Sequence, residues 1–168
     1  MTSFNPSHTF ITSDHHFGSW KNMPMPFHVF SENEEKVLIG KWNSIVCQND
    51  TVIYNGDFHD CGLTDLIEYR KKLNGNIILI KGNHDVLPTN VYKAVFQDVL
   101  DELFINEYSL LIHHCPRNLD DPREIFGHIH RSISVFDDPH RFCSCVQFND
   151  GYPVSLEKIL EKIKLQTY

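Results

Sequence analysis

Five short apolar runs in this chain each end in a block rich in Asp, Asn and His, and this recurring arrangement most constrains the fold. Stretches with apolar residues at helical spacing lie between several of the runs, so the pattern predicts an α/β layered fold. Polar residues that follow the strands of such a fold gather at the carboxyl edge of the sheet, where ligand sites form. The five blocks are Asp14-His15-His16, Asn55-Gly56-Asp57, Gly82-Asn83-His84-Asp85, His113-His114 and Gly127-His128-Ile129-His130.

The spacing of the apolar residues also predicts where helices and strands lie. Ser31 and Glu34 form a capping box, which predicts a helix that begins there and ends near Val46. A stripe of Leu and Ile after Ser155 predicts a last helix whose apolar face packs on the sheet. Further helices are predicted at Thr64–Leu73, which Asn74-Gly75 should end, and at Pro88–Gln97. Strands are predicted at His8–Ser13, Thr51–Asn55, Asn76–Lys81, Phe104–Ile105, Tyr108–His113, Glu124–Phe126 and Arg141–Phe148.

Length and composition indicate one globular unit. A chain of 168 residues fits a single domain over residues 1–168. Hydrophobic residues make up 41% and charged residues 22%, which excludes a disordered chain. No run approaches the roughly 18 apolar residues of a membrane span, and the first residues lack the basic and apolar regions of a signal peptide. We therefore expect a cytoplasmic protein without a membrane partner.

The charge balance and the cysteines exclude two other kinds of site. Lys and Arg number 15 against 22 Asp and Glu, and the formal charge of -7 has the wrong sign for a general nucleic-acid-binding surface. A small phosphate ligand is compatible with it. The five cysteines lack the paired spacing of a structural zinc site, so we interpret them as reduced thiols, with Cys143 and Cys145 on one face of a strand. None is among the candidate ligands, and a thiolate site is not indicated.

Histidine is unusually frequent, with 11 residues, most of them in or beside the five blocks. Asp, Asn and His together suit divalent cations such as Mn²⁺, Fe, Zn²⁺ or Ni²⁺. Each block alone is more simply explained as a turn after a strand, because Asn and Asp bond to their own backbone there. Their occurrence together, in this order and each after an apolar run, favours a metal site.

This series of motifs resembles that of the calcineurin-like metallophosphoesterase superfamily. Most of the chain is similar to the small single-domain bacterial and phage-type members, including the tail Tyr152-Pro153-Val154-Ser155-Leu156. The resemblance implies a sandwich of two β-sheets flanked by helices. The matching motifs are Asp14-His15-His16, Gly56-Asp57-Phe58-His59-Asp60, Gly82-Asn83-His84-Asp85, the His113-His114 pair and Gly127-His128-Ile129-His130.

The resemblance also implies two bound divalent metal ions, with Mn²⁺ favoured and Fe, Zn²⁺ or Ni²⁺ as alternatives. Asp57 would bridge the two ions. The other ligands would be Asp14, His16 and His130 at the first ion, and Asn83, His128 and one of the two adjacent histidines at the second. His114 is favoured, because His114-Cys115-Pro116 matches a His-x-Pro of the family. His113 is the alternative, since a register shift of one residue exchanges their faces.

For the other residues of the motifs, the resemblance implies roles around the metals. His84 would lie beside the leaving group, where an imidazolium can donate a proton. The predicted catalytic residues are therefore His84 and Asp85. Asp60 and Asp85 are expected to orient groups of the site by accepting hydrogen bonds from ligand histidines. His15 and His59 are expected beside the site and not as ligands.

The implied activity is hydrolysis of phosphodiester or other phosphate ester bonds in a small phosphate ester or nucleotide. A hydroxide bound between the two metals would attack phosphorus. A phosphomonoesterase or a nucleotide pyrophosphohydrolase is the alternative, and a non-catalytic metal-binding scaffold for protein interactions is a further one. The presence of His84 disfavours the scaffold, and Asp60-Cys61-Gly62 together with Asp85 argues against a protein phosphatase.

Some residues near the blocks have two interpretations. The segment Gly18–Phe30 is either a lid over the site or an apolar flap over the first helix. Four cations either contact phosphate oxygens or are solvated surface charges. These cations are Lys21, Arg117, Arg123 and Arg131, and the histidines without an expected role are His8, His28 and His140.

Overall fold

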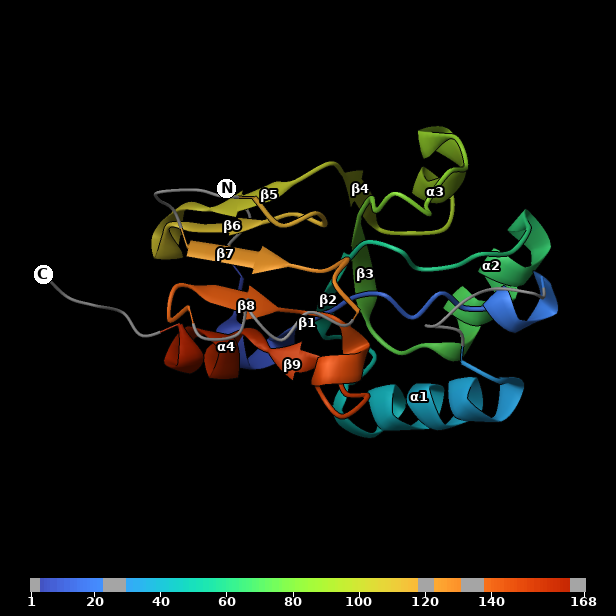
Figure 1. The fold of residues 1–168 in the computed structure, drawn as a ribbon, viewed down its shortest axis with the longest axis horizontal. Helices are drawn as coiled ribbons and strands as arrows, with labels where there is room; N and C mark the ends of the chain where they lie inside the picture. The colour runs from blue at the N-terminus through green and yellow to red at the C-terminus, as the bar shows by residue number, and fades with distance from the viewer. Residues whose placement is uncertain (1–3, 23–29, 118–122, 131–137, 164–168) are drawn as a thin grey trace, which may run out of the picture.

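Two β-sheets packed face to face form the centre of the molecule, with helices on the outer face of one of them (Figure 1). The computed structural model describes residues 4–22, 30–117, 123–130 and 138–163. The predicted fold class, two sheets flanked by helices, is confirmed. The five-stranded sheet has the order β4 (Asp98–Leu100), β3 (Asn76–Ile80), β2 (Thr51–Asn55), β1 (Thr9–Thr12), β9 (Val154–Ser155). The four-stranded sheet has the order β5 (Leu103–Ile105), β6 (Leu110–Ile112), β7 (Arg123–Phe126), β8 (Arg141–Cys143).

Strand direction determines where the polar blocks lie. Strands β1 to β4 are parallel, and so are β6, β7 and β8. Strands β9 and β5 pair antiparallel at one edge of each sheet. Because parallel strands end on the same side, the blocks after β1, β2 and β3 lie together, as do those after β6 and β7.

The central strands are buried on both faces. In β2, Val52 and Tyr54 face the helices, while Ile53 faces the core between the two sheets. Strand β3 repeats this alternation, as expected for side chains with a period of two. A strand covered on both faces needs apolar residues in succession, which explains the continuous apolar runs in the sequence.

In the part of the chain that the structure describes, four helices pack on the sheets: α1 (Glu32–Ile45), α2 (Leu63–Lys72), α3 (Thr89–Lys93) and α4 (Leu156–Lys162). The first three pack on the outer face of the five-stranded sheet, and α4 contributes to the core between the sheets, as predicted. The capping box of α1 is confirmed, because the Ser31 hydroxyl accepts from the Glu34 amide and the Glu34 carboxylate accepts from the Ser31 amide. Gly75, after α2, has the predicted left-handed conformation. Within the described residues, none of the helices is long and apolar enough to cross a membrane.

The helix predicted at Pro88–Gln97 is shorter than expected, because the chain changes partner. It ends with α3, and the Gln97 amide then donates to the Ile77 carbonyl at 2.9 Å as the chain joins β3 to form β4. The strand predicted at Tyr108–His113 begins later, because Ser109 has a left-handed φ of +47°. Strands β4 and β9 have too few residues to show a period and are not predicted.

The strand predicted at Arg141–Phe148 also ends early, at Cys143. The Ser144 amide still bonds to β7, whereas the Val146 amide bonds to the carbonyl that follows β1. The chain therefore crosses here from one sheet to the other. Cys143 and Cys145 are both buried in one small apolar cluster, although only the first lies in a strand.

Candidate metal centre

The polar blocks of both sheets meet and contact one another directly. The amide of His128, after β7, donates to both carboxylate oxygens of Asp14, after β1, at 3.0 and 3.1 Å. Nδ1 of His114, after β6, donates to the last carbonyl of β2 at 2.8 Å. The amide of His84, after β3, donates to Oδ1 of Asp57 at 2.8 Å. The five blocks thus form one cluster, which is assembled from two sheets and not from the edge of one.

Two glycines let the backbone approach the carboxylates closely. A Cβ atom on Gly82 would lie 2.2 Å from Oδ1 of Asp57, and one on Gly127 would lie 2.6 Å from Oδ2 of Asp14. Both distances are shorter than real Cβ contacts, so any side chain at these positions would displace a carboxylate. The glycines of the third and fifth blocks are therefore required by packing at the site.

Four of the expected ligands have a left-handed backbone, which is uncommon outside glycine. The angle φ is +63° at Asp14, +47° at His16, +56° at Asp57 and +69° at His128. This conformation costs roughly 1–2 kcal/mol per residue and persists only where the surrounding structure fixes it. Such strained residues are typically concentrated at functional sites, and here they gather at one cluster.

Asp14, His16, Asp57 and His130 present ligand atoms within 4.8 Å of one another. Nε2 of His16 lies 3.3 Å from Nε2 of His130 and 3.6 Å from Oδ2 of Asp57. Nε2 of His130 lies 3.4 Å from Oδ1 of Asp14. Lone pairs of nitrogen and oxygen that face a common centre repel one another unless a proton or a metal ion lies between them. Two imidazoles and two carboxylates fit a divalent metal ion of the first transition row.

Asp57 also faces a second group, formed with Asn83, His114 and His128. Nε2 of His114 lies 3.1 Å from Oδ2 of Asp57 and 3.1 Å from Oδ1 of Asn83. Because Nδ1 of His114 donates to a backbone carbonyl, Nε2 is the nitrogen that can bind a metal. The ring of His128 packs edge-on against that of His114, with 5.3 Å between centroids. Oδ2 of Asp57 therefore faces a histidine of each group.

The carboxylates give the cluster a strong attraction for positive charge. Burial alone would lower the pKa of the His114 imidazole, but the hydrogen bond to Asp57 and the charge of Asp14 outweigh burial and raise this pKa to about 9. Burial likewise opposes charge on His16, yet Asp60, Asp57 and Asp14 together raise its pKa. Burial would raise the pKa of Asp57, but His114 lowers it to about 2. A divalent cation would be stabilised by the same field.

His114 points into the cluster, whereas His113 points away from it. Nε2 of His113 lies 2.5 Å from Oε1 of Glu124, a buried carboxylate that Arg141 also contacts. Adjacent residues at the end of a strand point to opposite faces, so one of the two reaches the site and the other enters the second sheet. The structure thus brings the favoured histidine to the ligands and gives the alternative another partner.

Asp60 connects His16 to His84. Its Oδ2 accepts from Nδ1 of His16 at 2.9 Å, and its Oδ1 accepts from Nδ1 of His84 at 2.8 Å. The first bond leaves Nε2 of His16 for a metal ion. The second holds His84, whose side chain is 33% exposed, at the rim of the cluster. His84 and His16 are close enough to bind one cation together with Asp60, so metal retention by a His84 variant is a deciding measurement.

Asp85 holds the backbone of two blocks together, including that of the candidate ligand Asp57. Its buried carboxylate accepts from the amides of Asp57 at 2.9 Å, Phe58 at 3.1 Å and Gly82 at 2.9 Å. Burial raises the pKa of Asp85 to about 6. It acts as a positioning residue, because it fixes the backbone from which the Asp57 carboxylate projects.

The two histidines expected beside the site have structural partners. His15 is fully buried, stacks on Phe17 with 4.8 Å between ring centroids, and has Nδ1 2.7 Å from the hydroxyl of Tyr54. Burial lowers its pKa to about 3, so it is neutral. Nε2 of His59 lies 3.1 Å from the hydroxyl of Tyr92. Both rings contact aromatic residues of the apolar core between the five-stranded sheet and its helices.

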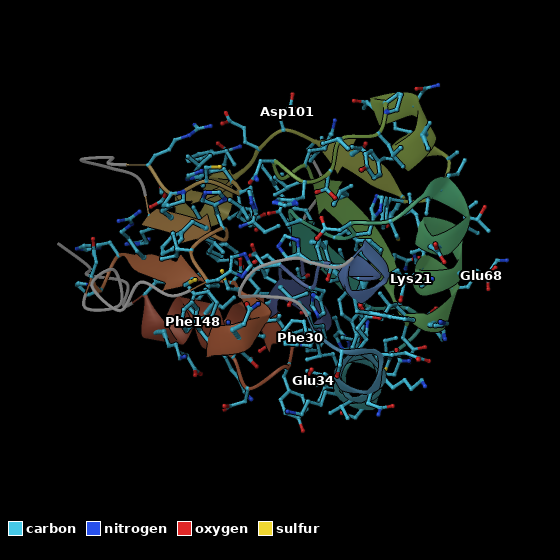
Figure 2. The ribbon with its side chains drawn as sticks, turned by 45° about the vertical axis from the view of Figure 1, so that its right-hand side comes forward. Lys21, Phe30, Glu34, Glu68, Asp101 and Phe148 are labelled. Atoms are coloured by element: carbon cyan, nitrogen blue, oxygen red, sulfur yellow. The ribbon has the colours of Figure 1, made fainter. Side chains whose placement is uncertain are left out.

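The candidate phosphate-binding cations that the structure describes are held by other groups. Lys21 lies beside α2, where it pairs with Asp65 at 2.5 Å (Figure 2). Arg117 pairs with a glutamate at 2.9 Å, and Arg123 donates to a backbone carbonyl at 2.9 Å. Arg131, His28 and residues 23–29 of the expected lid lie outside the described residues.

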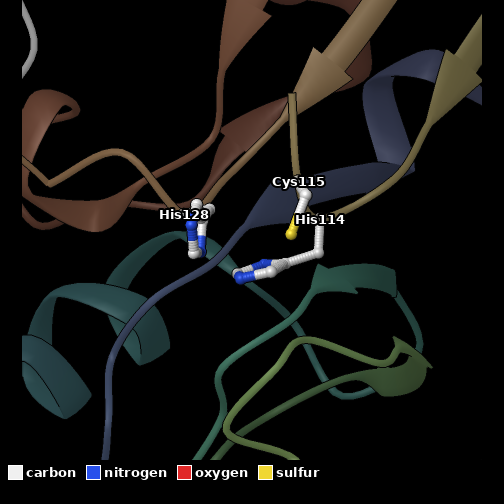
Figure 3. Close-up of side chains that lie close together, drawn as sticks. All are labelled: His114, Cys115 and His128. Atoms are coloured by element: carbon white, nitrogen blue, oxygen red, sulfur yellow. The ribbon is translucent and has the colours of Figure 1, made fainter. Parts of the chain in front are cut away.

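Cys115 is a residue of the cluster that the sequence did not reveal. Its sulfur and one ring nitrogen each of His114 and His128 lie within 4.8 Å of one another (Figure 3). Burial and the charges of Asp57 and Asp14 raise the pKa of this thiol. Its place directly after His114 is the signal that could have identified it, but a single cysteine without a paired spacing does not predict a ligand.

Replacing Asp85 by alanine is expected to lower the free energy of unfolding by roughly 3 kcal/mol, because three buried amides lose their acceptor. Urea denaturation of the metal-free protein measures this change. Asp65→Ala is the matched control, since its carboxylate forms an exposed pair worth less than about 1 kcal/mol. Equal losses for the two variants would contradict the positioning role.

The chain is similar to known proteins over most of its length. A family model for calcineurin-like phosphoesterases matches residues 8–161, a range that contains all five blocks. An uncharacterized protein of Methanocaldococcus jannaschii is 30% identical over 169 residues, which cover 92% of this chain and 90% of that protein. The crystal structure of a protein of unknown function from Aquifex aeolicus has a similar fold, with a TM-score of 0.70 and 22% identity over 91% of this chain and 97% of that one. The chain belongs to the calcineurin-like phosphoesterase family.

Proposed function

We propose that the protein is a hydrolase of phosphate esters that uses two divalent metal ions sharing Asp57. The observation that carries this proposal is the position of Oδ2 of Asp57, 3.6 Å from Nε2 of His16 and 3.1 Å from Nε2 of His114. The first ion would be bound by Asp14, His16, Asp57 and His130, and the second by Asp57, Asn83, His114 and His128. Mn²⁺ suits this nitrogen and oxygen donor set, as do Fe, Zn²⁺ and Ni²⁺.

Metal ions at these positions would supply a nucleophile at neutral pH and neutralise charge on the phosphate oxygens. The chain supports this chemistry in two ways. Asp57 reduces the repulsion between two close cations, because its negative charge lies between them. The hydrogen bond from Nδ1 of His16 to Asp60 fixes the ring, so that Nε2 is directed at the first position.

His84 is the group best placed to act on the leaving oxygen. Its amide is held by Asp57 and its Nδ1 by Asp60, so the ring has a fixed direction at the exposed rim of the cluster. An imidazole held in this way can donate a proton to an alkoxide as the bond to phosphorus breaks. A scaffold that only binds metal would not need such a group.

We infer a small phosphodiester, or another small phosphate ester or nucleotide, as the substrate. The formal charge of -7 and the ion-paired state of Lys21 and Arg117 argue against a general nucleic-acid surface. The five cysteines are free thiols, which supports a reducing compartment such as the cytoplasm. Assay of metal-loaded protein on phosphodiesters, cyclic nucleotides, nucleotide pyrophosphates and monoesters would rank the alternatives, and absence of turnover on all of them would contradict an enzyme.

Chelation is expected to abolish hydrolysis of an activated phosphodiester, and added Mn²⁺ should restore it, because the nucleophile depends on the metal. Metal should also raise the melting temperature, since a free metal concentration of 100 times Kd increases the free energy of unfolding by about 2.7 kcal/mol. Calorimetry with and without Mn²⁺ measures this shift. Full activity of demonstrably metal-free protein would overturn the mechanism.

Asp57→Asn is expected to reduce occupancy at both metal positions, whereas His130→Ala should reduce it mainly at one. An amide cannot supply the charge that lets two cations share a ligand. Elemental analysis after dialysis counts the bound ions, and Asp65→Asn, which changes an exposed carboxylate in the first turn of α2, is the control. Two ions bound to Asp57→Asn at wild-type affinity would refute the bridge.

His84→Ala is expected to keep its metals but to lose roughly 10² to 10⁴ in turnover, the usual contribution of a general acid. The loss should be greatest for a poor alkoxide leaving group and smallest for a nitrophenolate, which departs with little protonation. Exposed His140→Ala is the control. Equal losses for both leaving groups would favour an electrostatic role, and loss of metal would show that His84 is a ligand.

A further inference from the structure

We propose that Cys115 gives the second metal position a thiolate donor, so that a thiophilic cation such as Zn²⁺ or Cd²⁺ is bound there by His114, Cys115 and His128. This inference rests on the proposed dinuclear site. The sulfur and one nitrogen of each ring lie within 4.8 Å of one another. Figure 3 shows the sulfur on the same side of the backbone as the His114 ring, with His128 across from both.

The local backbone explains why two adjacent residues reach one centre. Strand β6 ends at Ile112, and the chain bends at His114 and Cys115. Within a continuous strand these two side chains would point to opposite faces. Pro116 restricts the backbone conformation of the residue before it, which limits the direction of the Cα–Cβ bond of Cys115.

The loop that carries His128 is fixed to the same segment. The Gly127 amide donates to the His114 carbonyl at 2.9 Å, and the His128 amide donates to the Asp14 carboxylate. The three donors therefore lie on two backbone segments with a direct hydrogen bond between them. Cys115 and His128 are exposed, so a cation can reach them from solvent.

The second position consequently offers two different donor sets. In the first set, Asp57 and Asn83 offer oxygen donors beside the imidazole nitrogen of His114. This combination of oxygen and nitrogen donors suits Mn²⁺. Cys115 adds sulfur to two imidazoles, and one thiolate with two histidines is a set that Zn²⁺ binds in tetrahedral geometry. A thiophilic ion would thus exchange oxygen for sulfur at this position and compete with Mn²⁺ there.

The other cysteines do not have this arrangement. Cys143 and Cys145 are buried in an apolar cluster, and Cys47 is exposed just before β2, at the opposite end of that strand from Asp57. Cys61 is partly buried, with its sulfur 3.6 Å from Nδ1 of a single histidine, His59. Among the described residues, the remaining groups of side chains that could bind a metal contain no cysteine. Cys47→Ser is therefore a matched control for Cys115→Ser.

Titration of the metal-free full-length chain with Co²⁺ and Cd²⁺ tests the inference. Wild type and Cys47→Ser should both develop a thiolate-to-metal charge-transfer absorption band in the ultraviolet, and Cys115→Ser should lack it. The affinity of Cys115→Ser for Cd²⁺ should fall by about tenfold or more, whereas its affinity for Mn²⁺ should not change. Because Cys115 is exposed, its replacement should leave the melting temperature unaltered.

A second measurement uses alkylation followed by peptide mapping. Cd²⁺ should protect Cys115 from iodoacetamide, Mn²⁺ should protect it less, and Cys47 should react in both cases. Wild-type protein that binds two Mn²⁺ ions but shows neither the absorption band nor protection by Cd²⁺ would overturn the role of Cys115 and leave the proposed function intact. Wild-type protein that binds none of these ions would overturn both.

Discussion

The rest of the site depends on the placement of the Asp57 carboxylate. Its Oδ2 faces a histidine of each ligand group, and its Oδ1 accepts from the His84 amide at 2.8 Å. The backbone below it has a φ of +56°, and the Asp85 carboxylate holds it through the amides of residues 57 and 58. Gly82 leaves room for the side chain, because any Cβ there would overlap Oδ1. A buried, negatively charged group that contacts two imidazoles is stable only because these contacts act together.

The two-sheet fold supplies the rigidity that this placement needs. Blocks follow β1, β2 and β3 in one sheet and β6 and β7 in the other, so each proposed metal position draws residues from both sheets. Hydrogen bonds between blocks of different sheets, from His128 to Asp14 and from His114 to β2, join the two halves. The apolar core between the sheets fixes the distance across which these bonds form. The strained backbone of the candidate ligands is therefore maintained by the core between the sheets and by the hydrogen bonds that join their blocks.

Features that depend on local pattern could be predicted from the sequence, and features that depend on tertiary placement could not. The strands before each block and the capping box at Ser31 follow from spacing and residue type. Asp85 differs, because its three amide partners come from two blocks and become neighbours only after folding. The crossing of the chain between sheets near Ser144 is likewise determined by which strand lies beside it. The closeness of Cys115 to His128 could not be predicted either, because the two residues follow different strands and meet only in the folded structure.

Three consecutive residues after β6 have three different surroundings, and this difference determines which of them can change without disturbing the rest of the site. His113 enters the second sheet and contacts Glu124, His114 contacts Asp57, and Cys115 lies at the exposed rim. A change at His113 would leave a buried carboxylate without one of its partners, and a change at His114 would remove a donor of the second position. Under the proposed function Asp57 would serve both metal positions, so a change there would affect both. Cys115 is exposed at the rim, so its replacement would change the preference of the proposed second position between oxygen-binding and sulfur-binding cations while the first is preserved.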